Sequence, residues 1–406
     1  MTTRRDRITF TGADGTTLSG KVEVPVGQVR GTAVFAHCFT CSSDSAATSR
    51  ISVALAEAGI AVLRFDFTGL GASGGHFADT NFTTNVADLV SAAQHLEEHY
   101  DAPGLLIGHS LGGAAVLAAA PRLPSVRAVV TIGAPSRPDH VLALLSGGLG
   151  DIERDGEATV DLGGRPFRVK AQLIEDLRAH SLEDCLAGLD AALLVMHSPV
   201  DQTVGIDNAA EIYTAARHPK SFVSLDGADH LLTDRADAAF AASIIHSWVE
   251  RYLEPMVEPD AAEPAVGVVV GETGQGAFVN QVVAGMHRFV MDEPASAGGL
   301  DVGPNPYELL AAALGGCTSM TMRMYAGRKG IPLQRAEVEV RHEKTHVQDS
   351  EVAMGSTKPL IDRWERRILL EGELTDGQRA DLMRIADRCP VHLTLERSSV
   401  VVTRPA

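Results

Sequence analysis

A proline-rich, acidic segment divides the 406-residue chain into two parts with different patterns. Residues 254–264, EPMVEPDAAEP, hold three prolines and four acidic residues, a composition typical of a stiff, solvated linker. Hydrophobic residues make up 45% of the chain and charged residues 21%, so each part can bury a core of its own. The sequence therefore predicts two domains, residues 1–253 and residues 265–406, joined by this linker.

In the first part, short apolar runs alternate with amphipathic stretches. The apolar runs are residues 31–36, 60–65, 105–107, 128–132 and 193–196, and the helical patterns are residues 49–58 and 85–99. This alternation predicts an α/β fold, a mostly parallel sheet with helices on both faces. Residues 136–190 interrupt it with a hairpin-like stretch, 159–169, and a helix from Ala171, and we expect a small cap there.

A G-x-S-x-G motif centres on Ser110, between an apolar run and a pattern of small residues typical of a helix. This strand–turn–helix setting lifts a serine hydroxyl out of a sheet as a nucleophile. Such a serine needs a histidine base and an orienting carboxylate. Asp201 and His230 follow Ser110 in the required chain order. Asp201 is preferred as the acid to Asp226 and Asp229, because it follows a strand of its own.

The first part resembles the α/β-hydrolase superfamily over nearly all of residues 1–252. Besides the motifs above, AHCF at 36–39 and FDFTGLGAS at 65–73 carry the resemblance. It implies a serine hydrolase of carboxylic esters that uses the triad just described. It also implies an oxyanion hole formed by the backbone N–H groups of Phe39 and Leu111.

Three further motifs have better structural explanations. C-x-x-C at 38–41 lies between a strand and a helix, as redox motifs do, but it falls on the expected oxyanion loop, so a redox role is the less favoured alternative. G-x-G-x-x-G at 69–74 mimics a dinucleotide fingerprint, but no helix begins directly after it. H-E-x-x-H at 342–346 has zinc-site spacing, but the residues before it alternate as in a strand, where four residues span about 13 Å. We expect no bound cofactor and no metal.

The second part has a different order of elements. Strand-like runs at 266–270, 278–283 and 287–291 precede one long apolar helix at 306–328; two strands, a helix at 377–388 and a final strand follow. This order predicts an α+β domain. Asn305, Pro306 and Glu308 form a well-specified start for the long helix.

Two cysteines of the second part stand out by position. Cys317 lies in the long helix, and Cys389 lies directly before Pro390, where one helix ends and another can begin. A thiolate at a helix N-terminus is stabilised by the backbone N–H groups there. Taken alone, each cysteine is better explained as a small buried structural residue.

The segments GPNPYELLAAALGGCT at 303–318 and RCPVH at 388–392 resemble the OsmC/Ohr family, the osmotically inducible and organic hydroperoxide resistance proteins. The resemblance covers about residues 266–406 and implies an intertwined homodimer with thiol peroxidase activity. Cys317 would attack the O–O bond of an organic hydroperoxide, Cys389 would resolve the sulfenic acid to a disulfide, and an external dithiol would reduce the pair.

The second part departs from the family pattern at one position. Family peroxidases have a glutamate directly after the proline of this helix, which holds an arginine over the thiolate. This chain has Tyr307 there and Glu308 one place later. No arginine lies between Val290 and Asn305, and Arg288 is the nearest one before them.

The charge and composition of the chain argue against several classes of binding partner. The net charge of −17 argues against nucleic acids and anionic membranes as partners. No apolar stretch follows the charged N-terminus and none is long enough to span a bilayer, so we expect no signal peptide and no membrane insertion. Five cysteines in a chain of this length predict reduced thiols in the cytoplasm.

The order of the two parts resembles known fusions of these two families. The sequence therefore predicts a cytoplasmic serine ester hydrolase fused to a thiol-dependent organic hydroperoxide reductase, both acting on small molecules. The alternative is a single-activity esterase whose OsmC-like domain serves only dimerisation or ligand binding.

Overall fold

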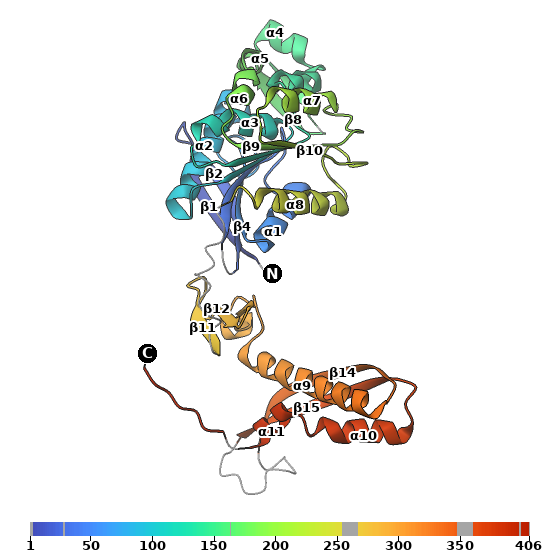
Figure 1. Ribbon diagram of the computed structural model, residues 1–406. Coiled ribbons are helices and arrows are strands. Elements are labelled where there is room, and N and C mark those ends of the chain that lie inside the picture. The colour runs from blue at the N-terminus through green and yellow to red at the C-terminus, as the bar shows by residue number, and fades with distance from the viewer. Residues whose placement is uncertain are drawn as a thin grey trace. The chain divides into compact units, whose positions relative to one another are not determined.

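The structure is a computed structural model that describes residues 3–26, 29–162, 164–253, 267–346, 360–397 and 399–405. The chain forms two compact units, Met1–Gly267 and Val268–Ala406 (Figure 1). The predicted linker 254–264 lies outside the described residues. In the part of the chain that is described, no helix combines the length and the hydrophobicity needed to cross a bilayer.

An eight-stranded sheet forms the centre of the first unit, in the order β1-β2-β4-β3-β5-β6-β9-β10. The pairs β1–β2 and β2–β4 are antiparallel, and the other neighbours are parallel. The strands are β1 (Thr3–Thr11), β2 (Thr17–Pro25), β3 (Gly31–Ala36), β4 (Ile60–Phe65), β5 (Leu105–His109), β6 (Ala128–Ile132), β9 (Ala192–His197) and β10 (Lys220–Ser224). The predicted mostly parallel sheet is confirmed, and its parallel strands read as continuous apolar runs because they are buried on both faces.

Helices cover both faces of this sheet, as predicted (Figure 1). One core contains side chains of α2 (Phe82–His99), α3 (Leu111–Ala119) and α7 (Asp207–Ala215). The opposite core contains α1 (Ala46–Glu57) and α8 (Arg235–Val249). The short helices η1 (Phe77–Asp79) and η2 (Ala120–Arg122) lie in connections.

The predicted cap is confirmed as a small insertion between β6 and β9. It comprises η3 (Pro138–Leu145), α4 (Leu149–Asp155), the hairpin of β7 (Glu157–Asp161) and β8 (Pro166–Lys170), α5 (Ala171–Ala179) and α6 (Glu183–Ala187). Its buried leucines and isoleucines belong to the same core as α2 and α3, so the cap is packed onto the sheet unit and lies at the top of Figure 1.

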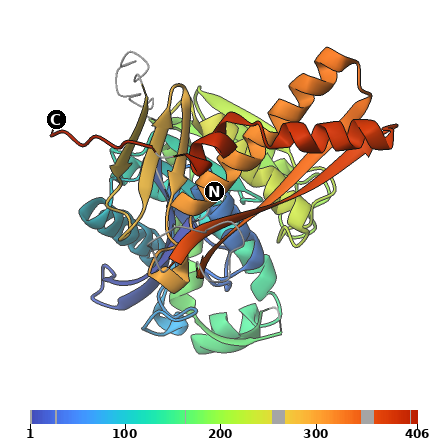
Figure 2. The ribbon, with the colours of Figure 1, turned by 90° about the horizontal axis from the view of Figure 1, so that it is seen from below.

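The second unit is α+β, as predicted. A three-stranded antiparallel sheet, β11 (Val268–Glu272), β12 (Asn280–Ala284) and β13 (His287–Met291), is followed by η4 (Ala295–Ala297), α9 (Pro306–Lys329), the antiparallel pair β14 (Leu333–His346) and β15 (Leu360–Gly372), α10 (Asp376–Ala386) and α11 (Pro390–Glu396). The helix α9 packs against β14, and α10 and α11 pack against α9 (Figure 1, Figure 2).

The start of α9 has the predicted reciprocal cap. The Asn305 side chain accepts from the Glu308 backbone N–H at 3.0 Å, and the Glu308 carboxylate accepts from the Asn305 N–H at 2.8 Å.

The predicted final strand is wrong. Residues 399–405 carry no strand, and Val400, Val401 and Val402 are exposed. A strand needs hydrogen bonds to a neighbour, and no strand of the described residues pairs with this run. An apolar β-branched sequence alone was therefore an insufficient signal.

Candidate functional sites

Ser110 occupies a sharp turn between β5 and α3. Its backbone has φ +56°, and its N–H donates to the Ile132 carbonyl at 2.9 Å. A Cβ on Gly108 would lie 2.3 Å from the Gly112 oxygen, and one on Gly112 would lie 2.4 Å from the Ala36 oxygen. Both positions must therefore be glycine for the strand and helix to approach this closely.

The structure brings Ser110, His230 and Asp201 together. In the sequence, His230 lies 120 residues after Ser110 and 29 residues after Asp201. His230 Nε2 lies 3.0 Å from Ser110 Oγ, and His230 Nδ1 lies 2.7 Å from Asp201 Oδ2. With the proton on Nδ1 held by the carboxylate, Nε2 is free to accept the serine proton. All three lie beyond the carboxyl ends of parallel strands, β5, β9 and β10, which meet at one edge of the sheet.

Asp201 is held as a carboxylate by its neighbours. Its Oδ1 accepts from the backbone N–H groups of Thr203 at 2.8 Å and Val204 at 2.9 Å. Burial raises the pKa of this carboxyl, but the hydrogen bonds from His230, Val204 and Thr203 outweigh burial, and the pKa lies below its usual value. Asp201 can therefore orient His230 as an anion.

A second histidine, which the sequence analysis did not single out, supports this site. His109 is buried at the end of β5, and its Nε2–H donates to the His230 backbone oxygen at 2.7 Å. Burial and the neighbouring His230 lower the pKa of His109 to about 4, so its ring is neutral. Its position directly before Ser110 in the motif was the one sequence feature that could have indicated this role. The role itself depends on a contact with His230, which lies 121 residues away.

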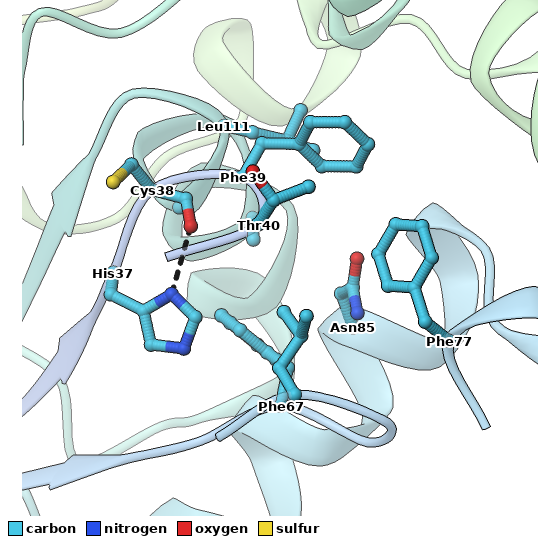
Figure 3. A pocket seen from close by; sticks show the side chains of 11 residues that line it. His37, Cys38, Phe39, Thr40, Phe67, Phe77, Asn85 and Leu111 are labelled. Carbon is cyan, nitrogen blue, oxygen red and sulfur yellow. Dashed lines mark hydrogen bonds between the residues drawn. The ribbon is translucent and has the colours of Figure 1, made fainter. Parts of the chain in front are cut away.

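The expected oxyanion donors, Phe39 and Leu111, line one pocket beside Ser110. Figure 3 shows Phe39 and Leu111 on one side of this pocket, opposite Phe77 and Asn85. Leu111 is the first residue of α3, where backbone N–H groups have no partner within the helix. Phe39 belongs to the loop after β3.

The cap packs against this loop. The rings of Phe39 and Phe77 lie 5.7 Å apart, and those of Phe77 and Phe167 lie 4.9 Å apart. Arg165, beside Phe167 on the cap hairpin, donates to the Thr40 backbone oxygen. Phe39 of the loop and Phe77 of η1 therefore line the pocket, and the cap packs against Phe77 through Phe167.

The prediction of reduced thiols is wrong for two of the five cysteines. Cys38 and Cys41, on the loop between β3 and α1, form a disulfide whose Cα atoms lie 5.4 Å apart. The physical reason is the turn between them: the Cys41 N–H donates to the Cys38 oxygen at 3.2 Å, which brings the side chains together. Cys185, Cys317 and Cys389 are free thiols.

In the second unit, Cys317 and Cys389 are brought together. Cys317 lies on α9 and is half-buried, and Cys389 caps the start of α11 and is buried. Burial raises the pKa of the Cys389 thiol, but hydrogen bonds from the His392 backbone, Thr318 and Cys317 outweigh burial and hold the pKa below its usual value. The His392 N–H lies 3.3 Å from the Cys389 sulfur. These hydrogen bonds therefore favour the thiolate form of Cys389.

Arg366, on β15, is a charged neighbour that sequence reasoning missed. It donates to Thr318 Oγ1 at 3.0 Å and to the Ala386 oxygen at 3.0 Å, and the same Thr318 oxygen lies 3.7 Å from the Cys389 sulfur. Arg366 also pairs with Asp387 at 2.8 Å. Arg288, the arginine considered from the sequence, is exposed on β13.

Tyr307, at the position of the family glutamate, stacks on His342, with ring centroids 4.3 Å apart. The His342 ring is also 4.3 Å from Trp364, and its Nε2 lies 2.8 Å from Asp362 Oδ1. His342 lies on β14, so the H-E-x-x-H residues form a strand, as predicted. The described residues contain no group of three or more His, Cys, Asp or Glu side chains arranged for a metal.

Two family profiles match the chain. The OsmC-like protein family matches residues 298–404, and the family described as serine aminopeptidase, S33, matches residues 27–150. Together with the parallel sheet and the serine at its strand–helix turn, they define a fusion of a serine α/β-hydrolase with an OsmC-like domain.

A solved structure identifies the family of the first unit. The esterase domain of a Rhodothermus marinus protein is 50% identical, with a TM-score of 0.52, and the match covers 61% of this chain and 99% of that one. The chain belongs to the family of that esterase domain.

Two curated relatives are more distant. A monoacylglycerol lipase of Mycolicibacterium smegmatis is 24% identical over 51% of this chain and 82% of its own length. A mitochondrial palmitoyl-protein thioesterase of Mus musculus is 25% identical over 48% of this chain and 66% of its own length.

Proposed function

We propose that residues 1–253 hydrolyse small carboxylic esters with Ser110 as nucleophile, His230 as general base and Asp201 as orienting acid. One observation carries the proposal, namely the continuous hydrogen-bond chain from Ser110 Oγ through His230 to Asp201 Oδ2 at 3.0 and 2.7 Å. The esterase, lipase and thioesterase named above all act on acyl compounds, which supports the same class of substrate here.

The geometry supports a two-step acyl transfer. Ser110 Oγ attacks the ester carbonyl while His230 Nε2 takes the serine proton, and the N–H groups of Phe39 and Leu111 bind the oxyanion. His230 then gives the proton to the leaving alcohol, which departs and leaves an acyl-serine. Water, deprotonated by His230, attacks this ester, and the acid is released as Ser110 recovers its proton. Asp201 stabilises the imidazolium formed in each step.

Apolar side chains line the pocket that holds the expected oxyanion donors. They are Phe39, Phe67, Leu70 and Phe77, and the cap ring of Phe167 packs against Phe77. Apolar walls of this kind suit the acyl part of an ester.

The test is the Ser110→Ala variant of the full chain, assayed on p-nitrophenyl butyrate. We expect kcat to fall by at least about 10⁴-fold, because the acyl-enzyme cannot form. A serine-reactive phosphonate should label the Ser110 peptide of the unmodified protein only. Ser146→Ala, at an exposed cap position, is the matched control and should retain full activity. Retained hydrolysis in Ser110→Ala would contradict the proposal.

We further propose that residues 265–406 reduce organic hydroperoxides with Cys317 and Cys389. Cys317 lines an open apolar groove with Ala313, Met320 and Met324, where a hydroperoxide can reach it, whereas Cys389 is buried. Attack by the Cys317 thiolate on the O–O bond forms a sulfenic acid and, with one proton, an alcohol. The Cys389 thiolate then attacks the sulfenic sulfur and, with another proton, water leaves. An external dithiol restores the thiols; neither site needs a bound cofactor.

Cumene hydroperoxide with a small dithiol tests this proposal. We expect peroxide consumption, a Cys317–Cys389 linked peptide in mass spectra, and a dimedone-reactive sulfenic acid on Cys317 in the Cys389→Ser variant. Ser110→Ala should consume peroxide at the full rate. Cys185→Ser, which removes a free thiol of the other unit, is the control. Absence of peroxide consumption would favour the alternative, an esterase whose OsmC-like domain serves dimerisation or ligand binding.

We propose that the protein lies in the cytoplasm, forms a homodimer through residues 265–406 and has no nucleic acid partner. The acidic net charge of −17 opposes binding to nucleic acids. Exposed apolar side chains on β11 support the dimer, and its test is given below.

A further inference from the structure

The loop that carries the expected oxyanion donor is closed by a covalent bond. Cys38 and Cys41 are three residues apart in sequence and are joined through their sulfur atoms, so the ring they close contains Phe39 and Thr40. Cys38 is 4% exposed, and Cys41 is half-buried. In Figure 3 the Cys38 sulfur points away from Phe77 and Asn85.

Several contacts hold this loop in one conformation. Thr40 has φ +59°, in the left-handed region that a β-branched residue rarely adopts without support. The Cys41 N–H donates to the Cys38 oxygen, which also accepts from His37 Nδ1 at 2.8 Å. The cap residue Arg165 donates to the Thr40 oxygen. The disulfide is the covalent member of this set, and the Phe39 N–H lies inside the ring that it closes.

We propose that Cys38 and Cys41 form a reversible redox site that sets the rate of ester hydrolysis at Ser110. The proposal rests on the esterase function proposed above. In the disulfide form, the loop holds the Phe39 N–H beside that of Leu111. In the dithiol form, Thr40 relaxes from its left-handed conformation and one oxyanion donor is misplaced, so hydrolysis slows.

Reduction begins at the more accessible sulfur. A thiolate of an external dithiol attacks Cys41 Sγ, forms a mixed disulfide and releases the Cys38 thiolate. The second thiol of the reductant, as its thiolate, then displaces Cys41, so two electrons pass to the protein and the reductant leaves as its own disulfide. Protons from solvent complete the two thiols.

Oxidation uses a hydroperoxide. The Cys41 thiolate attacks the O–O bond, which yields a sulfenic acid and, with one proton, an alcohol or water. The Cys38 thiolate attacks the sulfenic sulfur, the disulfide forms, and the displaced hydroxide takes a proton to become water. Peroxide therefore switches hydrolysis on and a dithiol switches it off.

The experiment measures kcat and KM of the full chain on p-nitrophenyl butyrate in three states: as isolated after oxidation, after dithiothreitol, and after re-oxidation with cumene hydroperoxide. Alkylation and mass spectrometry assign the state of each cysteine. We expect kcat to fall about tenfold or more on reduction, with KM changed less than twofold, and to recover on re-oxidation. Loss of one oxyanion donor lowers kcat about 10²–10³-fold in other hydrolases, and this is the largest decrease that we expect on reduction.

Two variants complete the test. Cys38→Ser/Cys41→Ser should have the low kcat of the reduced protein and no response to dithiothreitol, while phosphonate titration shows an intact count of reactive Ser110. Cys185→Ser should respond as the unmodified protein does. The proposal is overturned if kcat stays within twofold when this pair is reduced, if the double variant matches the oxidised protein, or if dithiothreitol cannot open the bond. No hydrolysis in the oxidised protein would instead overturn the esterase function itself.

Discussion

At the scale of single residues, His109 shows how the site depends on a buried neutral ring. Its Nε2–H holds the backbone of the loop that carries His230, and the two rings lie 5.2 Å apart. Burial and the neighbouring His230 lower the pKa of His109 to about 4, against about 6.5 in an unfolded chain. Protonation of His109 would therefore oppose the folded state.

The first residue-scale prediction concerns stability against pH. Between pH 6.5 and 4 the unfolded chain binds a proton at His109 and the folded chain does not, so the free energy of unfolding falls as the pH falls through this window. From pH 7 to pH 5, His109 should cost about 2 kcal/mol of stability. His109→Gln keeps a hydrogen-bond donor but cannot be protonated. Between pH 7 and pH 5 it should therefore lose about 2 kcal/mol less stability than the unmodified protein does. Urea unfolding at both pH values, followed by Trp248 fluorescence in a Trp364→Phe background, measures it.

The control for this prediction is His76→Gln, which removes an exposed histidine of the same unit. It should leave the pH dependence unchanged. An equal loss of stability in His109→Gln and in the unmodified protein would contradict the neutral buried state of His109.

At the scale of elements, a buried ion pair joins β2 to β4 beside the oxyanion loop. Arg64, with no exposed side-chain surface, lies 2.8 Å from Glu23 and donates to the Ser43 oxygen at 2.6 Å. The Ser43 N–H in turn donates to Asp66 at 2.6 Å. Removing one member of such a pair leaves a buried charge without its partner.

The element-scale prediction is that Glu23→Gln lowers the free energy of unfolding of the first unit by about 3 kcal/mol. Arg5→Gln removes the partly exposed cation on the same carboxylate, 2.6 Å away, and should cost less than about 1 kcal/mol. Urea unfolding by Trp248 fluorescence compares the two variants. Glu23→Gln removes both ion pairs, whereas Arg5→Gln removes only the exposed one. Equal losses of stability in the two variants would therefore contradict a contribution from the buried Glu23–Arg64 pair.

At the scale of the whole molecule, the second unit exposes apolar surface on β11. Val268, Val269 and Val270 on this strand are 64%, 54% and 52% exposed. Exposed apolar patches of this kind are typical of surfaces that another protein covers. A second copy of this chain is the partner proposed above.

Sedimentation equilibrium of the full chain tests the dimer. We expect a mass of about 86 kDa, twice the 42.9 kDa of one chain. Val269→Glu on β11 should shift the equilibrium towards monomer, because it places a charge in the apolar surface. Leu144→Glu, at an exposed apolar position of the cap, should not. A monomer mass at micromolar concentration would contradict the dimer.

Most of the fold could be predicted because its signals are local. Hydrophobic periodicity predicted the parallel sheet, both sets of helices and the hairpin of the inserted cap. Residues within three or four positions of one another predicted the capped start of α9. The final strand failed because Val400–Val402 has strand composition without a partner strand in the described chain. The roles of Ser110, Asp201 and His230 remain predictions that the geometry supports.

The sequence by itself determined which residue types could meet at the nucleophile, because a glycine-rich turn after a strand and the chain order of acid and base depend only on the local backbone and on topology. Only the tertiary structure decided the partners of two buried or half-buried groups, His109 with the His230 backbone and Arg366 with Thr318. It also decided that Cys38 and Cys41 are joined. These pairings depend on burial and on distances of a few ångströms between segments, which residue spacing does not specify.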